Sequence, residues 1–201
     1  MKRKIKRILL VSIVFAAMLL SGCSDTGNIE QNTIVVKKDG TILGAIIEDF
    51  SDSKYVSEEL KAMLEEEIAA YNAKAGEGKV ALETYEVTED KKVKVYLEYA
   101  SFEDYAGFNE ETFFVGTVSE AYEAGYEFVD MENVTEEGSP IGKADVLEKG
   151  SMKMVIFEEP VHVRVNGKIT YVSSGVAAEG KKEAVVNQEE GMTETFYLMY
   201  E

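Results

Sequence analysis

Short runs in which apolar and polar residues alternate follow one another along most of the chain, as is typical of half-buried β-strands. The runs Thr33–Lys37 and Thr41–Ile47 flank Asp39-Gly40, a pair that favours a tight turn, so they predict a hairpin. The runs Val80–Val87 and Lys91–Tyr99 predict a second hairpin. In its second strand, every other residue is apolar and is expected to face the core: Val93, Val95, Leu97 and Tyr99.

The segment between the two hairpins has helical periodicity. Over residues 57–75, apolar side chains recur every three or four positions and form one stripe: Leu60, Met63, Leu64, Ile68 and Tyr71. Glu58 and Glu59 suit the first turn because carboxylates interact favourably with the positive end of the helix dipole. Gly76 is a suitable C-terminal stop, so the sequence predicts one long helix here.

Two shorter helices are predicted farther along the chain, at about 101–107 and 117–124. The first begins at Ser101, a residue type that is common at helix N-termini. The second begins at Thr117, and Glu120 three residues later completes the sequence of a capping box.

The polar, glycine-rich stretch 132–150 predicts a loop with at most one short strand. The remainder predicts strands and no helix, at Met152–Phe157, Val161–Val165, Ile169–Ser173, Ala184–Val186 and Thr195–Tyr200. This order of hairpins, helices and strands predicts an α+β fold with a mainly antiparallel sheet. We expect one globular domain over 32–201, with a β-rich subdomain from about residue 150 as an open alternative.

The turn at Asn166-Gly167 allows the register of one predicted hairpin to be tested. A two-residue loop would place Val163 opposite Thr170, whereas a three-residue loop places Val163 opposite Ile169. The second arrangement keeps apolar residues on one face. We therefore expect a hairpin with the three-residue loop and with Gly167 in a left-handed bulge.

The first 22 residues have the order of a secretory signal peptide. Basic residues fill most of positions 2–7, mostly apolar residues follow over 8–20, and small residues then lead to Cys23. As a helix, the apolar part would span roughly 20 Å, which is short of the ~30 Å hydrocarbon core of a bilayer. We therefore expect residues 1–22 to be removed and not to remain as a transmembrane helix.

The sequence Leu20-Ser21-Gly22-Cys23 resembles the lipobox of bacterial lipoprotein precursors. The resemblance implies that a diacylglyceryl group is attached to the sulfur of Cys23 and that cleavage occurs between Gly22 and Cys23. Two acyl chains give stable anchoring in a bilayer, where one is marginal. Residues 23–31 would then be a lipidated N-terminus and tether on the outer face of the cytoplasmic membrane. In general make-up, the remainder resembles small lipoproteins of Gram-positive bacteria, which implies no particular activity.

The charge of the chain limits its partners. Loss of residues 1–22 would remove five of the 21 Lys and Arg residues and none of the 38 Asp and Glu residues, leaving a formal charge of −22. Phosphate binding needs a basic face, so nucleic acid is excluded as a partner. Such a charge favours the solubility of an exported domain. Because Cys23 is the only cysteine, lipidation would leave no thiol for a disulfide or for metal ligation.

Few residue patterns in the chain are typical of catalysis. His162 is the only histidine, and its alternation with valines predicts the exposed face of a strand. No phosphate-binding glycine motif and no Gly-x-Ser-x-Gly motif occurs, so no cofactor and no catalytic residue is predicted. Glu48, Asp49 and Asp52 form an acidic cluster without the spacing of an EF-hand loop, which predicts a solvated loop and not a calcium site.

Half of the 20 aromatic residues lie between Tyr96 and Phe128. Aromatic faces can stack on sugars or peptides, but tryptophan is absent from the chain. We therefore expect this concentration to serve core packing around the two short helices.

These observations favour a non-enzymatic, membrane-anchored protein of the cell envelope with a binding or structural role. Two alternatives stay open: a cell-surface hydrolase that uses carboxylates to cleave glycan or peptide, and a cation-binding envelope factor. Substrate-binding components of transporters share the lipid anchor, but they usually have two α/β lobes, which this hairpin-rich sequence does not indicate.

Overall fold

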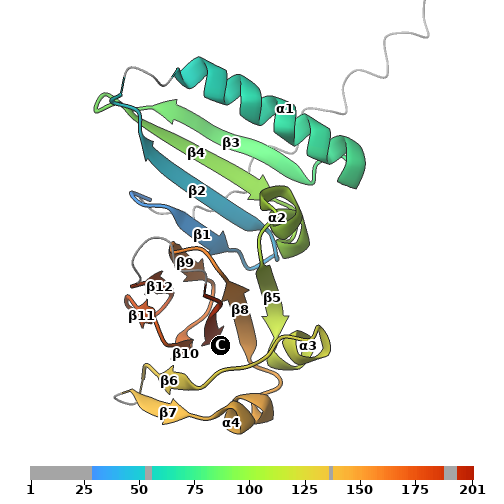
Figure 1. The fold of residues 1–201 in the computed structure, drawn as a ribbon, viewed down its shortest axis with the longest axis vertical. Coiled ribbons are helices and arrows are strands. Elements are labelled where there is room, and N and C mark those ends of the chain that lie inside the picture. Colours follow the sequence, from blue (N-terminus) through green and yellow to red (C-terminus); the bar gives the residue numbers. More distant parts are fainter. Residues whose placement is uncertain (1–28, 53–55, 136–137, 188–193) are drawn as a thin grey trace, which may run out of the picture.

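The computed structural model describes residues 29–52, 56–135, 138–187 and 194–201. Within these ranges the chain forms thirteen strands and four helices, and the strands lie in two sheets (Figure 1). The α+β fold class and the mainly antiparallel arrangement are therefore confirmed.

The larger sheet has seven strands, in the order β11-β12-β9-β1-β2-β4-β3. Their bounds are Thr33–Val36 (β1), Ile42–Asp49 (β2), Val80–Val87 (β3), Lys92–Tyr99 (β4), His162–Val165 (β9), Val176–Ala178 (β11) and Glu183–Val186 (β12). Neighbouring strands are antiparallel except for β1 and β9, which run parallel. This pair joins the two N-terminal hairpins to strands from the C-terminal part of the chain.

The smaller sheet has six strands, in the order β5-β8-β13-β10-β6-β7, and all neighbours are antiparallel. Their bounds are Phe113–Thr117 (β5), Met131–Asn133 (β6), Ser139–Ile141 (β7), Lys153–Phe157 (β8), Ile169–Ser173 (β10) and Phe196–Tyr200 (β13).

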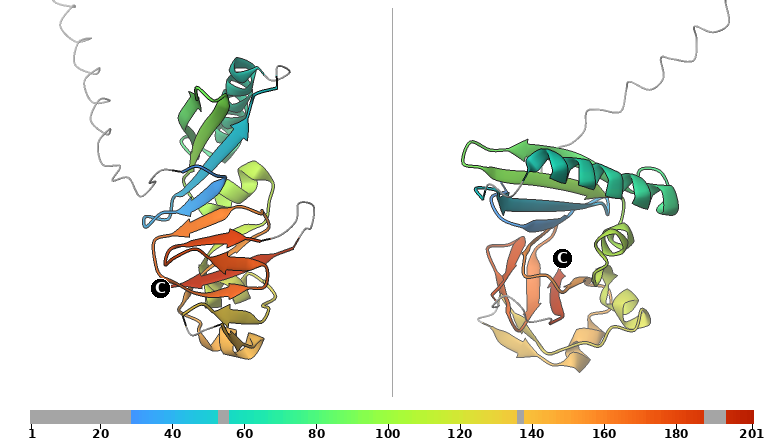
Figure 2. Two further views of the ribbon diagram at one scale, coloured as in Figure 1. Left: turned by 90° about the vertical axis from the view of Figure 1, so that its left-hand side faces the viewer. Right: turned by 45° about the horizontal axis from the view of Figure 1, so that its top comes forward.

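The helices cover the sheets unevenly, as Figures 1 and 2 show. Helix α1 (Ser57–Ala75) lies over β3 and β4, and α2 (Phe102–Asn109) lies where the two sheets meet. Helices α3 (Val118–Glu123) and α4 (Lys143–Glu148) pack on the far side of the six-stranded sheet. The inner face of the seven-stranded sheet is thus covered by α1 at one end and by the six-stranded sheet at the other.

One hydrophobic cluster is shared by both sheets and by α1. It includes Ile34 and Val163 from the larger sheet, Phe157 and Leu198 from the smaller sheet, and Leu64 from α1, all of them buried. A second cluster lies between the six-stranded sheet and α3 and α4. A third, small cluster of Ile29, Val35, Leu43 and Ala45 lies on the opposite face of the seven-stranded sheet, which we call its outer face.

Most elements with a strong local pattern form where the sequence predicts them. Helix α1 has the predicted bounds, and both N-terminal hairpins form. On β4 the alternation is complete, since every second residue from Val93 to Tyr99 is buried. The Thr117 hydroxyl accepts the Glu120 N–H at 3.2 Å, while the Glu120 carboxylate accepts the Thr117 N–H at 2.6 Å, so the predicted capping box is confirmed.

Met63 departs from the predicted apolar stripe of α1, because its side chain is 51 % exposed. Helix α1 covers only part of one sheet face, so a narrower stripe than the sequence offers is buried, with Leu64 at its centre. The helix is also fixed by a polar clamp: the Asn72 side chain accepts the Val80 N–H at 2.9 Å and donates to the Val80 carbonyl at 2.8 Å.

The expected loop over 132–150 contains more structure than predicted, because β6, β7 and α4 all fall within or beside it. These are short elements. The strands pair with distant or equally short neighbours, and α4 begins at Lys143 after a glycine, Gly142. The sequence likewise does not predict strands β5 and β11, since apolar and polar residues do not clearly alternate in them.

The predicted hairpin around Asn166-Gly167 is wrong. Strands β9 and β10 belong to different sheets, so Val163 pairs with Ile34 and Ala184 and not with Ile169. Both valine and isoleucine still reach the shared core, but from opposite sheets. The predicted alternation of buried residues is kept on β9, but on β10 a register shift between Ile169 and Tyr171 places these two residues in different clusters.

Gly167 has a different role from the one expected, since its φ is not in the left-handed region. A Cβ at this position would lie 2.0 Å from the carbonyl oxygen of Glu201. Glu201 is held there by two backbone hydrogen bonds with Lys168, of 2.7 and 3.0 Å. Glycine is therefore required for a close backbone approach where the chain passes from one sheet to the other.

Gly167→Ala should destabilise the fold by about 1–3 kcal/mol, because the added methyl group must displace the backbone at Glu201. Urea unfolding followed by circular dichroism measures the effect. Gly142→Ala is the matched control, since a Cβ there meets its nearest atom at 3.7 Å and φ is −78°. Equal stability of the two variants would contradict the close approach.

Candidate functional site

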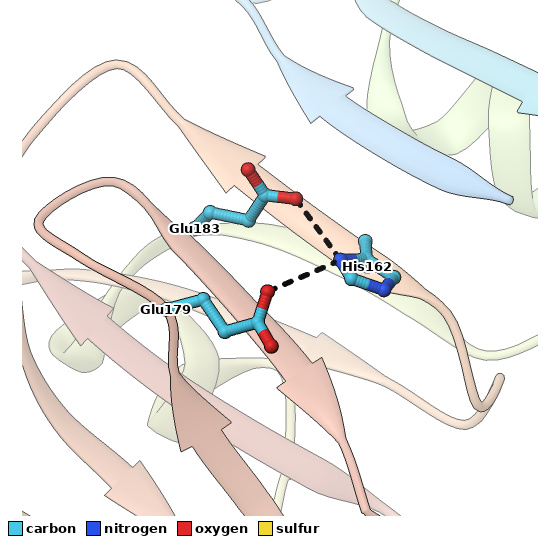
Figure 3. A group of neighbouring side chains, drawn as sticks. All are labelled: His162, Glu179 and Glu183. Atoms are coloured by element: carbon cyan, nitrogen blue, oxygen red, sulfur yellow. Dashed lines mark hydrogen bonds and ion pairs between the residues drawn. The ribbon is translucent and has the colours of Figure 1, made fainter. Parts of the chain in front are cut away.

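Three side chains that can ligate a metal ion converge on the outer face of the seven-stranded sheet: His162, Glu179 and Glu183 (Figure 3). The His162 Nδ1 atom lies 2.9 Å from Glu183 Oε1 and 3.9 Å from Glu179 Oε2. One ligand atom from each residue lies within 4.8 Å of the other two. Among the residues that the structure describes, this is the one group of three or more such side chains brought so close together.

The local chain path explains why these residues meet. Residues Glu179 and Glu183 close the β11–β12 hairpin, where the Glu179 N–H donates to the Glu183 carbonyl at 2.7 Å. Gly180 in the turn has φ +82°, a conformation that glycine adopts without a steric cost. Pairing of β12 with β9 then places Val185 opposite His162 and Glu183 opposite Arg164, so the glutamates reach the face of the sheet that carries the histidine.

Arg164 orients one of the two glutamates. Its Nε donates to Glu183 Oε2 at 2.8 Å, which leaves Oε1 directed at His162. Burial alone would raise the pKa of Glu183, but the hydrogen bonds from Arg164 and His162 outweigh it and hold the pKa below its ordinary value. Glu183 therefore stays ionised at neutral pH.

The group is open on one side and enclosed on the other. The side chain of Glu179 is 57 % exposed, whereas those of His162 and Glu183 are 13 % and 24 % exposed. His162 also lines a cavity of about 500 Å³, together with six other polar side chains: Glu30, Gln31, Asn32, Glu48, Asp49 and Lys92. This cavity extends along the outer face beside the segment that enters β1.

The expectation for His162 is met in part. It lies on the polar face of its strand, as its alternation with valines predicts, but it is largely enclosed and not freely exposed. Two residues of the acidic cluster, Glu48 and Asp49, line the cavity, and Asp49 is engaged by the Ser51 N–H at 2.8 Å. Asp52 is not among the lining residues, so the three carboxylates of the cluster do not surround one point.

A second group of titratable side chains lies at the junction of the sheets. Glu111, in the turn between α2 and β5, is within hydrogen-bonding reach of Glu159, in the turn between β8 and β9. We call these two residues the acid pair. Tyr105 from α2 donates its hydroxyl to Glu159 at 2.8 Å. Burial, followed by the contact with Glu159 and the charge of Glu158, raises the pKa of Glu111 to about 7.

The aromatic residues between Tyr96 and Phe128 mostly pack in the interior, as expected. Tyr99 contacts Tyr105 edge to face with ring centres 4.9 Å apart, and Tyr105 in turn contacts Phe113 at 4.5 Å. Burial raises the pKa of Tyr99 to about 12, so its hydroxyl stays neutral. The exception is Tyr122, which is exposed on α3.

Cys23 and Gly22, the residues that the lipobox resemblance assigns to lipidation and cleavage, lie outside the described residues. Within the described ranges, none of the helices has both the length and the apolar character needed to span a bilayer. In comparisons with known proteins, no protein-family model, no curated protein and no solved structure matches this chain.

The acid pair predicts a pH-dependent stability. Because the folded-state pKa of Glu111 is about 7, above its ordinary value of 4.5, its contribution is fully present below about pH 4.5 and is lost as the pH rises through about 7. Glu111 as a whole is only partly buried, so we expect solvent screening to limit the effect to about 1 kcal/mol, or ~2–4 °C in the melting temperature.

Thermal unfolding at pH 6 and pH 8 measures this dependence. Glu111→Gln should reduce the difference in melting temperature between the two pH values, because glutamine has no proton to lose. Glu123→Gln, at an exposed position on α3, should leave the difference as in the parent protein. An unaltered pH dependence in Glu111→Gln would show that the acid pair does not titrate in this range.

Proposed function

We propose that this chain is a lipid-anchored protein of the bacterial cell envelope whose folded domain has a non-enzymatic binding role. The Leu20-Ser21-Gly22-Cys23 sequence supports the anchor, with Cys23 as the lipidated residue after cleavage at Gly22. The domain would lie on the outer face of the cytoplasmic membrane, with the bilayer as one partner and a ligand of the domain as the other.

The observation that supports this role most directly is where the fold begins. Ile29, the first residue that the structure describes, is buried with 1 % of its surface exposed, and it lies six positions after Cys23. Five residues, 24–28, remain between the two, and fully extended they reach about 18 Å. A tether of that length would hold the domain close to the membrane.

The cavity on the outer face lies beside this attachment point. Glu30, Gln31 and Asn32 line it directly after the buried Ile29, and the Asn32 carbonyl accepts the His162 N–H at 3.0 Å. A binding surface next to the tether would remain within a short distance of the bilayer whatever the orientation of the domain. Its carboxylates favour a cationic ligand over an anionic one.

The geometry gives less support to a carboxylate-dependent hydrolase. Retaining glycosidases hold their two carboxyl groups about 5–5.5 Å apart, and inverting enzymes hold them farther apart to admit a water molecule. Glu111 and Glu159 are within hydrogen-bonding reach of each other, and neither lines the outer-face cavity. This arrangement fits a shared proton in a packed junction better than a substrate site.

Cys23→Ser tests the anchor. In a bacterial host labelled with a palmitate analogue, the parent protein should incorporate label and should be cleaved, because the thiolate is the group that accepts the lipid. The variant should accumulate as an unlabelled precursor of higher mass. Ser21→Ala, which keeps a small residue before the cleavage site, is the control and should be labelled normally.

Protease treatment of intact protoplasts tests the location in the same strains. The labelled parent protein should be digested without lysis, since the domain would face outward. Normal labelling of Cys23→Ser, or full protection of the parent protein, would contradict the proposed function.

A further inference from the structure

We propose that His162, Glu179 and Glu183 form a binding site for a single zinc ion, with one position left for water. This proposal does not depend on the lipid anchor. It assigns a defined chemistry to one point of the outer face, where the cavity alone indicates only a preference for cations.

The spacing of the ligand atoms fits tetrahedral coordination. Zinc binds imidazole nitrogen at about 2.0–2.1 Å and carboxylate oxygen at about 2.0–2.2 Å, so two ligands of a tetrahedral ion lie about 3.3–3.5 Å apart. The distances from His162 Nδ1 to Glu183 Oε1 and to Glu179 Oε2, 2.9 and 3.9 Å, fall on either side of this value. Shifts of about half an ångström would bring each carboxylate to the ligand distance from Nδ1, and the two carboxylate oxygens lie within 4.8 Å of each other, close enough to approach one ion by side-chain movement.

Hydrogen bonds and strand pairing orient the proposed ligands, as is common in metal sites. Carboxylate ligands of metals are commonly hydrogen-bonded through their second oxygen, which fixes their orientation. Arg164 supplies that contact to Glu183 at 2.8 Å. His162 is positioned by its strand pairing on both sides, with β1 and with β12, so the most enclosed ligand is also the most constrained.

The charge of the group also favours a divalent ion. Two carboxylates and one guanidinium give a formal charge of −1 with neutral imidazole, and a zinc ion would convert it to +1. The proton that Nδ1 now shares with Glu183 would move to Nε2, so that Nδ1 and Glu183 Oε1 could both bind the ion and the imidazole would stay neutral. An ion pair network without a metal accounts for Glu183 and Arg164. Glu179 adds a second carboxylate at 3.9 Å from Nδ1 (Figure 3), so the same nitrogen faces two carboxylates, one of which is exposed enough to move.

The ligand set selects among metals. Calcium takes six to eight oxygen ligands and magnesium keeps several waters, so neither ion suits three ligands of which one is an imidazole. Imidazole and carboxylate together suit zinc, and three protein ligands with an open position are typical of zinc sites that retain water.

Isothermal titration of the full-length, detergent-solubilised protein with zinc chloride, after treatment with EDTA, tests the site. We expect one zinc ion per chain and a higher melting temperature in zinc, because the ion binds the folded state. Calcium at the same concentration should leave the melting temperature unchanged. Cobalt substitution should give the visible absorption of a tetrahedral ion.

His162→Gln and Glu179→Gln should each weaken zinc binding by at least ~10–100-fold, the loss that follows even from removal of an outer-shell partner. The Glu179 side chain is exposed, so this variant should keep the stability of the parent protein without zinc. The control is Glu98→Gln, which removes a carboxylate paired with Lys37 on the same outer face, three strands away from β9. It should bind zinc as the parent protein does.

Glu179→His separates coordination from general attraction to negative charge. An imidazole can replace the carboxylate as a ligand, so this variant should keep a one-to-one zinc site although it has lost a negative charge. Zinc binding that is absent from the parent protein, or that survives unchanged in both His162→Gln and Glu179→Gln, would overturn the proposal. So would a Glu179→His variant that binds no better than Glu179→Gln.

Discussion

The parallel pairing of β1 with β9 is the interaction on which the rest of the structure depends. It joins residues 33–36 to residues 162–165 and so converts two sets of hairpins into one seven-stranded sheet. The inner face of that sheet then has room for both α1 and the six-stranded sheet, which share one hydrophobic cluster. The same pairing places Asn32 against His162 and thus assembles the wall of the outer-face cavity. The hydrophobic core and the candidate site therefore both depend on the pairing of β1 with β9.

Local sequence signals predicted the local structure well. The bounds of α1, the capping box at Thr117 and the alternation on β4 each depend on residues within a few positions of one another. The prediction of a hairpin at Asn166-Gly167 is wrong because distant strand partners decide whether the chain turns back in one sheet or passes to the other. Ile34 and Glu201 decide it, and no pattern near the turn reveals them. The prediction of a loop over 132–150 missed two strands, because they are too short to show an alternation of apolar and polar residues.

The candidate site likewise has one part that the sequence predicts and another that it does not. Alternation predicts that His162 lies on the polar face of its strand. Nothing in the sequence connects it with Glu179 and Glu183, because the pairing of β12 with β9 cannot be inferred from local pattern. Among the acidic residues that the structure describes, the β11–β12 hairpin and its pairing with β9 distinguish these two from the rest. The sequence does not predict the acid pair either, since Glu111 and Glu159 lie in two turns that are far apart in the chain. Cys23 is the opposite case, because the role proposed for it depends on a short contiguous motif and on no knowledge of the fold.

The burial of Ile29 at the start of the fold has a mechanical consequence. Tension applied through the N-terminal segment would pass directly into β1, which is hydrogen-bonded to β2 on one side and β9 on the other. The component of that force along the strand would load both hydrogen-bond ladders in shear, so both would have to break before β1 could leave the sheet. A strand at the edge of a sheet would instead be peeled away bond by bond. The entry of the chain into an interior strand thus makes the domain resistant to pulling from the end at which the lipid anchor is proposed.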